Sequence, residues 1–215
     1  MYLFTSETVS AGHHDKCADI IADSIVDTLL QLDSDAKVAT EVFISGKHII
    51  IGGEVKTKVA LDDSFYEEIA LNALKKIGYP ETGFDRVETF FPDEAEIHVY
   101  VSTQSPDITM GVVKEDNEIG AGDQGMMFGY ASSERDDYMP SAFSYAREIR
   151  DVLYDYALKH PGTFGVDMKT EVVMDYITKK NFDDCNPQRI AKIIVAISHN
   201  KEVEQKEVKR LVKNI

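Results

Sequence analysis

A glycine-rich segment, Gly120–Gly125 (GAGDQG), sets Asp123 and Gln124 among small residues near the middle of the chain. Glycine lets the main chain approach a ligand closely, and the spacing satisfies the dinucleotide-binding pattern G-x-G-x-x-G. That pattern requires a buried strand before it and a helix opening at its end. A charged run, Lys114–Glu118, precedes it instead, and Gly129 lies where the helix should begin. A Rossmann-type site is therefore excluded.

His13, Asp15 and Lys16 lie in a turn at the start of the first expected helix. Helix N-termini carry unpaired N–H groups and a partial positive charge, so anions bind there. An imidazole, a carboxylate and an ammonium at this place could hold a metal-bound polyphosphate. The alternative is that Asp15 complements the helix dipole and the other side chains are solvated. Taken alone, this turn favours the alternative.

Two acids lie on an expected strand pair. Glu41 interrupts the apolar stretch Val38–Ile44, and Glu54 follows two glycines on the partner strand. A carboxylate on a buried sheet face needs a cation or hydrogen-bond donors. Strand alternation equally permits solvent exposure, since Glu41 shares a face with Phe43. The residues alone leave these alternatives equal.

Three weaker signals complete the polar inventory. Gln104–Asp107 opens a long loop, for which a plain proline turn is the alternative. Asp167 and Lys169 begin an expected strand after a glycine-containing turn, for which a surface ion pair is the alternative. The remaining histidines have no spacing that indicates a shared metal; they are His48, His98, His160 and His199.

Hydrophobic periodicity and turn residues predict the elements that position these groups. Helices are expected over 14–32, from a cap at Asp62 or Asp63 to Gly78, from Pro140 to about His160, and over 202–212. Strand pairs are expected at 38–44 with 47–55, at 86–91 with 95–101, and near 169–177 with 189–198. Residues 102–137 lack a period and are typical of a functional loop. Paired strands alternating with single helices indicate an α+β fold.

Composition narrows the class of protein. The 215 residues are 43% hydrophobic and 28% charged, as in ordinary globular proteins, with a net charge of −15 that opposes nucleic-acid binding. Cys17 and Cys185 have no metal-ligand spacing, so reduced thiols in a cytoplasmic protein are expected. The first residues lack a basic segment and a long apolar stretch, so neither a signal peptide nor membrane insertion is expected.

Together these segments resemble the methionine adenosyltransferases (S-adenosylmethionine synthetases), from the first residues to about residue 200. The matching segments are Phe4–Glu7, Gly12-His13 with Asp15-Lys16, Gly52–Glu54, Gln104–Ile108, and Gly120–Gly125 continuing through Met127–Tyr130. The resemblance implies an enzyme that joins ATP to L-methionine, making S-adenosylmethionine and releasing pyrophosphate and phosphate.

The resemblance also implies roles for individual residues. His13 would hydrogen-bond the triphosphate near the breaking bond, and Asp167 and Lys169 would contact ATP, with His13 and Lys169 catalytic. Asp15 would hold Mg²⁺ and Glu41 an activating K⁺.

On the methionine side, the resemblance implies that Glu54 and Gln104 contact the substrate, with Asp123 near its amino group. Residues 104–114 match a mobile loop that gates the site. One departure lies beside His13, where the family has proline and this chain has His14.

Length is the larger departure, because the family's chains are nearly twice as long and comprise three similar α+β domains. The expected fold is therefore two such domains, each with a small mixed or antiparallel sheet covered by helices, with the third family domain absent. The expected division is 1–12 with 130–215 for one domain, and 13–129, carrying the loop 104–114, for the other.

Two functional hypotheses follow. In the first, the chain is one subunit of a split adenosyltransferase, active with a second polypeptide that supplies the missing C-terminal domain, and a dimer of heterodimers is expected. In the second, it is a non-catalytic subunit that regulates a full-length adenosyltransferase.

Overall fold

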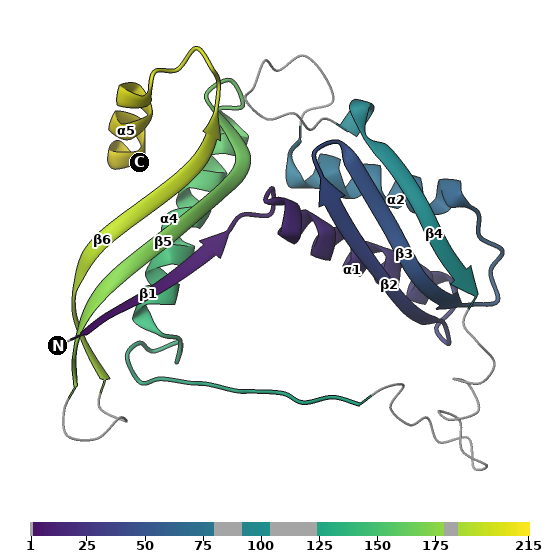
Figure 1. The fold of residues 1–215 in the computed structure, drawn as a ribbon, viewed down its shortest axis with the longest axis horizontal. Coiled ribbons are helices and arrows are strands. Elements are labelled where there is room, and N and C mark those ends of the chain that lie inside the picture. The colour runs from purple at the N-terminus through teal and green to yellow at the C-terminus, as the bar shows by residue number, and fades with distance from the viewer. Residues whose placement is uncertain (1, 80–91, 104–123, 179–184) are drawn as a thin grey trace.

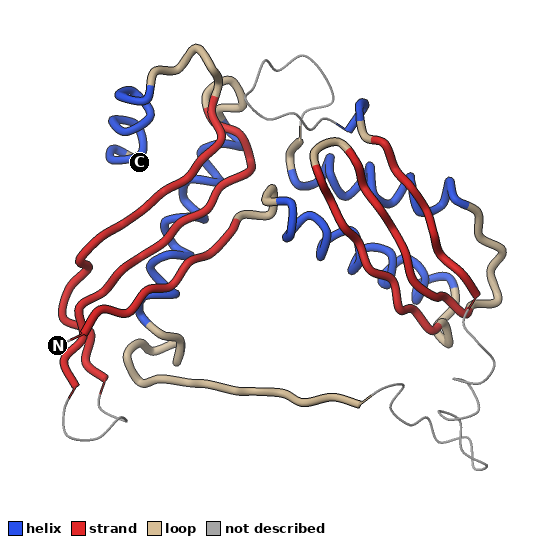
Figure 2. The backbone as a smooth tube through the Cα atoms, in the orientation of Figure 1, coloured by secondary structure: helices blue, strands red, loops and turns tan. Residues whose placement is uncertain are grey.

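The computed structural model describes residues 2–79, 92–103, 124–178 and 185–215. These residues form two separate three-stranded sheets, each with helices against one face (Figures 1 and 2). The expected α+β class with two small sheets is confirmed. The helices lie behind both sheets in Figure 1, so the opposite face of each sheet is open.

The first sheet joins the start of the chain to its last third. Its strands have the order β1-β5-β6, and both pairings are antiparallel: β1 is Tyr2–Val9, β5 is Phe164–Thr178 and β6 is Cys185–His199. Helix α4 (Ser141–Lys159) buries Ala142 and Ala146 against β5. The amphipathic α5 (Gln205–Asn214) packs through Val208 near the other end of α4.

The second sheet has the order β2-β3-β4, with β2 at Lys37–Ser45, β3 at His48–Lys56 and β4 at Glu96–Thr103. β2 and β3 form a hairpin, whereas β4 lies parallel to β3, after a 3₁₀ turn at Pro92–Glu94. Helices α1 (His14–Leu32) and α2 (Asp63–Ile77) cover one face. Four fully buried residues at every fourth position of α1 supply its core stripe: Cys17, Ile21, Ile25 and Leu29.

The open face of the second sheet carries large apolar side chains. Phe43 is 62% exposed and Tyr100 is 69% exposed, and Ile50 lies between them at 38%. Contiguous apolar surface of this kind usually marks an interface.

Most expected elements are observed with small shifts of their ends. Asp62 caps α2 by accepting from the Phe65 N–H, and Gly78 ends that helix in the left-handed region with φ 96°. Strand β5 begins at Phe164 rather than at Asp167, so Asp167 and Lys169 lie inside the strand and not at its start. Strand β1 was not expected at all. The expected strand at 86–91 lies outside the described residues.

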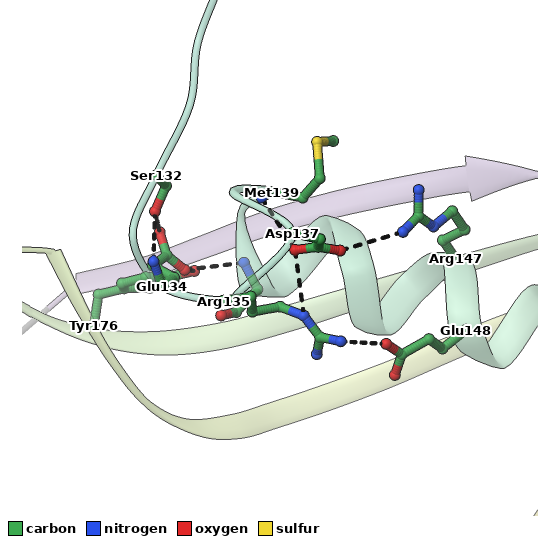
Figure 3. A network of polar contacts seen from close by, with 9 residues as sticks. Ser132, Glu134, Arg135, Asp137, Met139, Arg147, Glu148 and Tyr176 are labelled. Carbon is green, nitrogen blue, oxygen red and sulfur yellow. Dashed lines mark hydrogen bonds and ion pairs between the residues drawn. The ribbon is translucent and has the colours of Figure 1, made fainter.

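A carboxylate organises the start of α4 (Figure 3). Glu134 accepts hydrogen bonds from the Ser141 N–H at 2.9 Å, the Tyr176 hydroxyl at 2.8 Å and the Ser132 hydroxyl at 3.0 Å. Beside it, Arg135 pairs with Glu148 at 2.5 Å and Arg147 with Asp137 at 3.4 Å. Burial alone would raise the pKa of Glu134, but these donors outweigh it and lower the pKa.

We expect Glu134→Gln to lower the free energy of unfolding by about 1 kcal/mol at pH 7, since hydrogen bonds to a charged acceptor are replaced by weaker ones. A carboxyl whose pKa is depressed on folding stabilises the protein above its unfolded pKa, and this stabilisation disappears as the pH falls through the folded pKa. Urea unfolding from pH 7 downward should therefore show the two proteins converging. The control is Asp136→Asn, an exposed neighbour. A difference independent of pH would contradict this assignment.

Candidate active site

The turn between β1 and α1 is fastened to β5 by Ser10, which is 1% exposed. The Ser10 hydroxyl donates to the Val166 carbonyl at 2.6 Å and accepts from the Met168 N–H at 3.0 Å. The Ser10 N–H donates to the Met168 carbonyl at 2.9 Å. Ser10 thereby joins the turn to the β5 backbone at the two residues that flank Asp167.

Close packing fixes the next residues. A Cβ on Gly12 would lie 2.4 Å from the Val166 carbonyl oxygen, so only glycine fits there without a backbone shift. The buried Tyr79 hydroxyl donates to the Gly12 carbonyl, and the Cys17 thiol donates to the Ala11 carbonyl at 3.1 Å. Helix α1 therefore begins at a defined place beside β5.

His13 is the N-cap of α1. Its Nδ1 accepts from the Asp15 N–H at 3.3 Å, an arrangement in which a neutral ring carries its proton on Nε2. Nε2–H then remains available as a donor, and the imidazole is only 24% exposed. The Asp15 carboxylate lies 3.9 Å from Nδ1 and is 93% exposed. A donor and an open carboxylate thus stand together at the positive end of a helix.

Asp167 and Lys169 lie on the part of β5 against this turn. Burial raises the pKa of Asp167, while positive charge at His13, His14 and Lys169 opposes that rise. The Lys169 ammonium is 40% exposed and lies 3.4 Å from the Glu7 carboxylate of the paired strand β1. The structure therefore brings together four of the expected site residues: His13, Asp15, Asp167 and Lys169.

This arrangement can bind an anion and a metal ion at once. The N–H groups of the first turn of α1, the His13 ring and Lys169 can donate to phosphate oxygens. The Asp15 carboxylate offers the hard oxygen ligand that Mg²⁺ requires. These local donors oppose the strongly negative overall charge of the chain.

The other expected site residues lie elsewhere. Glu41 and Glu54 are on the open face of the second sheet, Glu41 exposed and Glu54 half-buried, in register with Gly52 and Ala39 respectively. Within the described ranges, no hydrogen bond or ion pair joins either acid to the group around His13. Gln104 and Asp123 lie outside the described residues, as does the loop 104–114.

Sequence reasoning missed Ser10, Tyr79 and the specific role of Glu7. Glu7 belonged to a matching segment, but its ion pair depends on β1, which was not expected. Ser10 and Tyr79 act through residues more than sixty positions away. No local pattern signals such contacts.

The fold and the site define an α+β protein with a helix-terminal site suited to a metal-bound polyphosphate. The family models that match are the N-terminal domain of S-adenosylmethionine synthetase, over residues 1–106, and its central domain, over residues 118–215. The chain belongs to the S-adenosylmethionine synthetase family, as the resemblance indicated.

Individual relatives agree. The S-adenosylmethionine synthase of Mesoplasma florum is 39% identical over 99% of this chain, and that of Cytophaga hutchinsonii is 40% identical over 100% of it. A solved S-adenosylmethionine synthetase from Campylobacter jejuni matches the whole chain with a TM-score of 0.86 at 45% identity. The chain spans 53%, 49% and 53% of these three proteins. Among the described residues, no helix combines the length and apolarity needed to cross a membrane.

We expect Asp167→Asn to make the unliganded chain more stable at pH 7. A carboxyl whose pKa is raised on folding costs stability as the pH rises past its unfolded pKa, and an amide has no such cost. Urea unfolding should give a higher free energy for the variant at pH 7 and a shrinking gap toward pH 3. The exposed Asp23→Asn serves as control. A less stable variant at pH 7 would show that Asp167 is stabilised by its cationic neighbours more than burial penalises it.

Proposed function

We propose that this chain is a subunit of a split methionine adenosyltransferase, which makes S-adenosylmethionine from ATP and L-methionine and releases pyrophosphate and phosphate. The proposal rests on one observation above all: His13, Asp15, Asp167 and Lys169 converge where the N-terminus of α1 meets β5. That convergence depends on the buried contacts of Ser10, Gly12 and Tyr79.

ATP would bind with its triphosphate at the start of α1. The His13 Nε2–H and the Lys169 ammonium would donate to phosphate oxygens, and Asp167, held partly buried beside them, would contact the nucleotide. The Asp15 carboxylate suits Mg²⁺ because it is an exposed hard oxygen donor. When bound, Mg²⁺ would neutralise phosphate charge.

Methionine would be held by carboxylate and amide groups: Glu54, Gln104 and Asp123. A carboxylate is a suitable partner for the methionine ammonium group. Glu41 would hold K⁺ on the same open sheet face as Glu54. Since no described contact links that face to His13 within one copy, we infer that Glu41 and Glu54 complete the site of a second copy, which implies a dimer of heterodimers.

The reaction forms a bond from the methionine sulfur to the ribose 5′ carbon and breaks the bond from that carbon to the triphosphate oxygen. Water then cleaves the triphosphate into pyrophosphate and phosphate. A thioether is a weak nucleophile, so alignment of the sulfur and stabilisation of the leaving oxygens supply most of the acceleration. His13 and Lys169 are the groups of this chain that would stabilise the leaving triphosphate.

A second polypeptide would supply the cationic phosphate ligands of the family's C-terminal domain, which the matched N-terminal and central domains do not include. We further propose the division into 1–12 with 130–215 and 13–129, which follows the two sheets. We also propose a cytoplasmic location, which fits a buried Cys17 thiol that is not part of a disulfide. The apolar open face around Phe43 and Tyr100 would lie in an interface above about 2,000 Å², the range of obligate assemblies.

The first test is native mass spectrometry of the tagged chain, purified gently from its source cells. We expect a stoichiometric companion of similar or smaller mass, because the site needs a second set of phosphate ligands. A companion of about twice this chain's length would support a regulatory subunit instead. The chain alone, converting ATP and methionine at full rate, would contradict the split enzyme.

We expect His13→Ala to lower the activity of the assembled complex about a hundred- to a thousandfold, the usual cost of removing one group that stabilises developing charge. Turnover of ATP and methionine, followed by S-adenosylmethionine and phosphate release, measures this. The control is His160→Ala, which removes an exposed histidine at the C-cap of α4. Unchanged activity with His13→Ala would favour the regulatory subunit.

A further inference from the structure

Two histidines and a glutamate meet at the beginning of β3 and β4, on the open face of the second sheet. The parallel register sets His48 opposite Glu96, and His98 follows Glu96 by two residues on the same face. The His48 and His98 rings lie nearly parallel with their centroids 5.9 Å apart. The expectation that these histidines share no metal rested on sequence spacing alone, which does not reveal this register.

The donor atoms are already close to metal-binding geometry. His48 Nδ1 lies 3.2 Å from Glu96 Oε2, and one donor atom from each residue lies within 4.8 Å of the others. In a tetrahedral zinc site with bonds of about 2.0–2.1 Å, ligand atoms are about 3.3 Å apart. The His48–Glu96 spacing therefore already suits such a site, and the His98 donor atom lies within 4.8 Å of both.

The chemistry of the donors selects the ion. Two imidazoles with one carboxylate suit Zn²⁺ and neighbouring transition metals, whereas Mg²⁺ prefers an all-oxygen shell. The side chains of His48 and Glu96 are nearly half exposed, at 48% and 45%, so an ion can enter and water can complete its coordination. Among the residues that the structure describes, this is the group of three potential ligands that meets such distances.

We propose that His48, Glu96 and His98 form a Zn²⁺-binding site that fastens β4 to β3. This site uses none of the residues assigned to ATP, methionine, Mg²⁺ or K⁺, so it is independent of the proposed reaction. Because β4 reaches β3 from a distant part of the chain, an ion that binds only the paired strands stabilises the folded state.

Lys47 competes for the same carboxylate. Its ammonium pairs with Glu96 Oε1 and must move aside, or share the carboxylate, when a metal ion binds. Removing this ammonium should strengthen metal binding, whereas removing a ligand should weaken it. Removing the Lys47 ammonium and removing a ligand should thus change Zn²⁺ affinity in opposite directions, a result that general misfolding cannot produce.

The first measurement is calorimetric titration of the full chain with Zn²⁺. Excess Mg²⁺ is present so that sites made of oxygen ligands alone are already occupied. The second measurement is the melting temperature with and without Zn²⁺. Loss of even an outer-shell partner costs about ten- to a hundredfold in metal affinity, so we expect His98→Asn to weaken binding at least about tenfold. Lys47→Met should bind more tightly than the wild type. Zn²⁺ should raise the melting temperature of the wild type and Lys47→Met, and much less that of His98→Asn.

His160→Asn is the matched control, since it removes an exposed histidine outside the cluster and should leave Zn²⁺ affinity unchanged. Equal affinities of the wild type and His98→Asn would overturn the proposal, as would a wild type that Zn²⁺ does not stabilise. Equal loss in His98→Asn and His160→Asn would overturn it too, because binding would then be a general property of surface histidines.

Discussion

The hydrogen bonds between Ser10 and β5 position the candidate site at the start of α1. One buried hydroxyl donates to the Val166 carbonyl and accepts from the Met168 N–H, so it closes the junction between β1 and β5. Gly12 then packs directly on Val166, His13 follows as the N-cap, and α1 begins at His14. Because α1 also packs on β2, the same junction sets where the second sheet lies relative to the first.

The side chains at this junction are more positively charged than the chain as a whole. A protein with net charge −15 gathers His13, His14 and Lys169 around a half-buried Asp167. A partly buried acid beside basic groups in this way is an arrangement that binding and catalytic sites often have. The surrounding contacts of Ser10 and Tyr79 hold the backbone on either side of this group in place.

Local patterns were sufficient for much of the fold. The buried stripe of α1, the Asp62 and Gly78 caps of α2 and the hairpin of β2 with β3 all depend on neighbours in sequence, and all are observed, the hairpin with its turn at Gly46-Lys47. Strand β1 could not be foreseen in this way because its partner strand in the described part of the chain, β5, begins at Phe164. For the same reason the sequence did not reveal which face of the sheet Glu41 occupies, because this depends on α1 and α2 covering the opposite face. The meeting of His48 with His98 likewise depends on a parallel register that joins segments fifty residues apart.

The pairing of β1 with β5 has a consequence for how the protein is made. Synthesis proceeds at about 5–20 residues per second, so the last residue of β1 is joined to the chain roughly 8–30 s before the first residue of β5. During that interval the whole second sheet is translated, while Leu3 and Phe4 of β1 have no strand beside them. The nascent chain therefore presents an apolar, unpaired edge for many seconds, and β1 is the segment for which a ribosome-bound chaperone would have the longest opportunity to act.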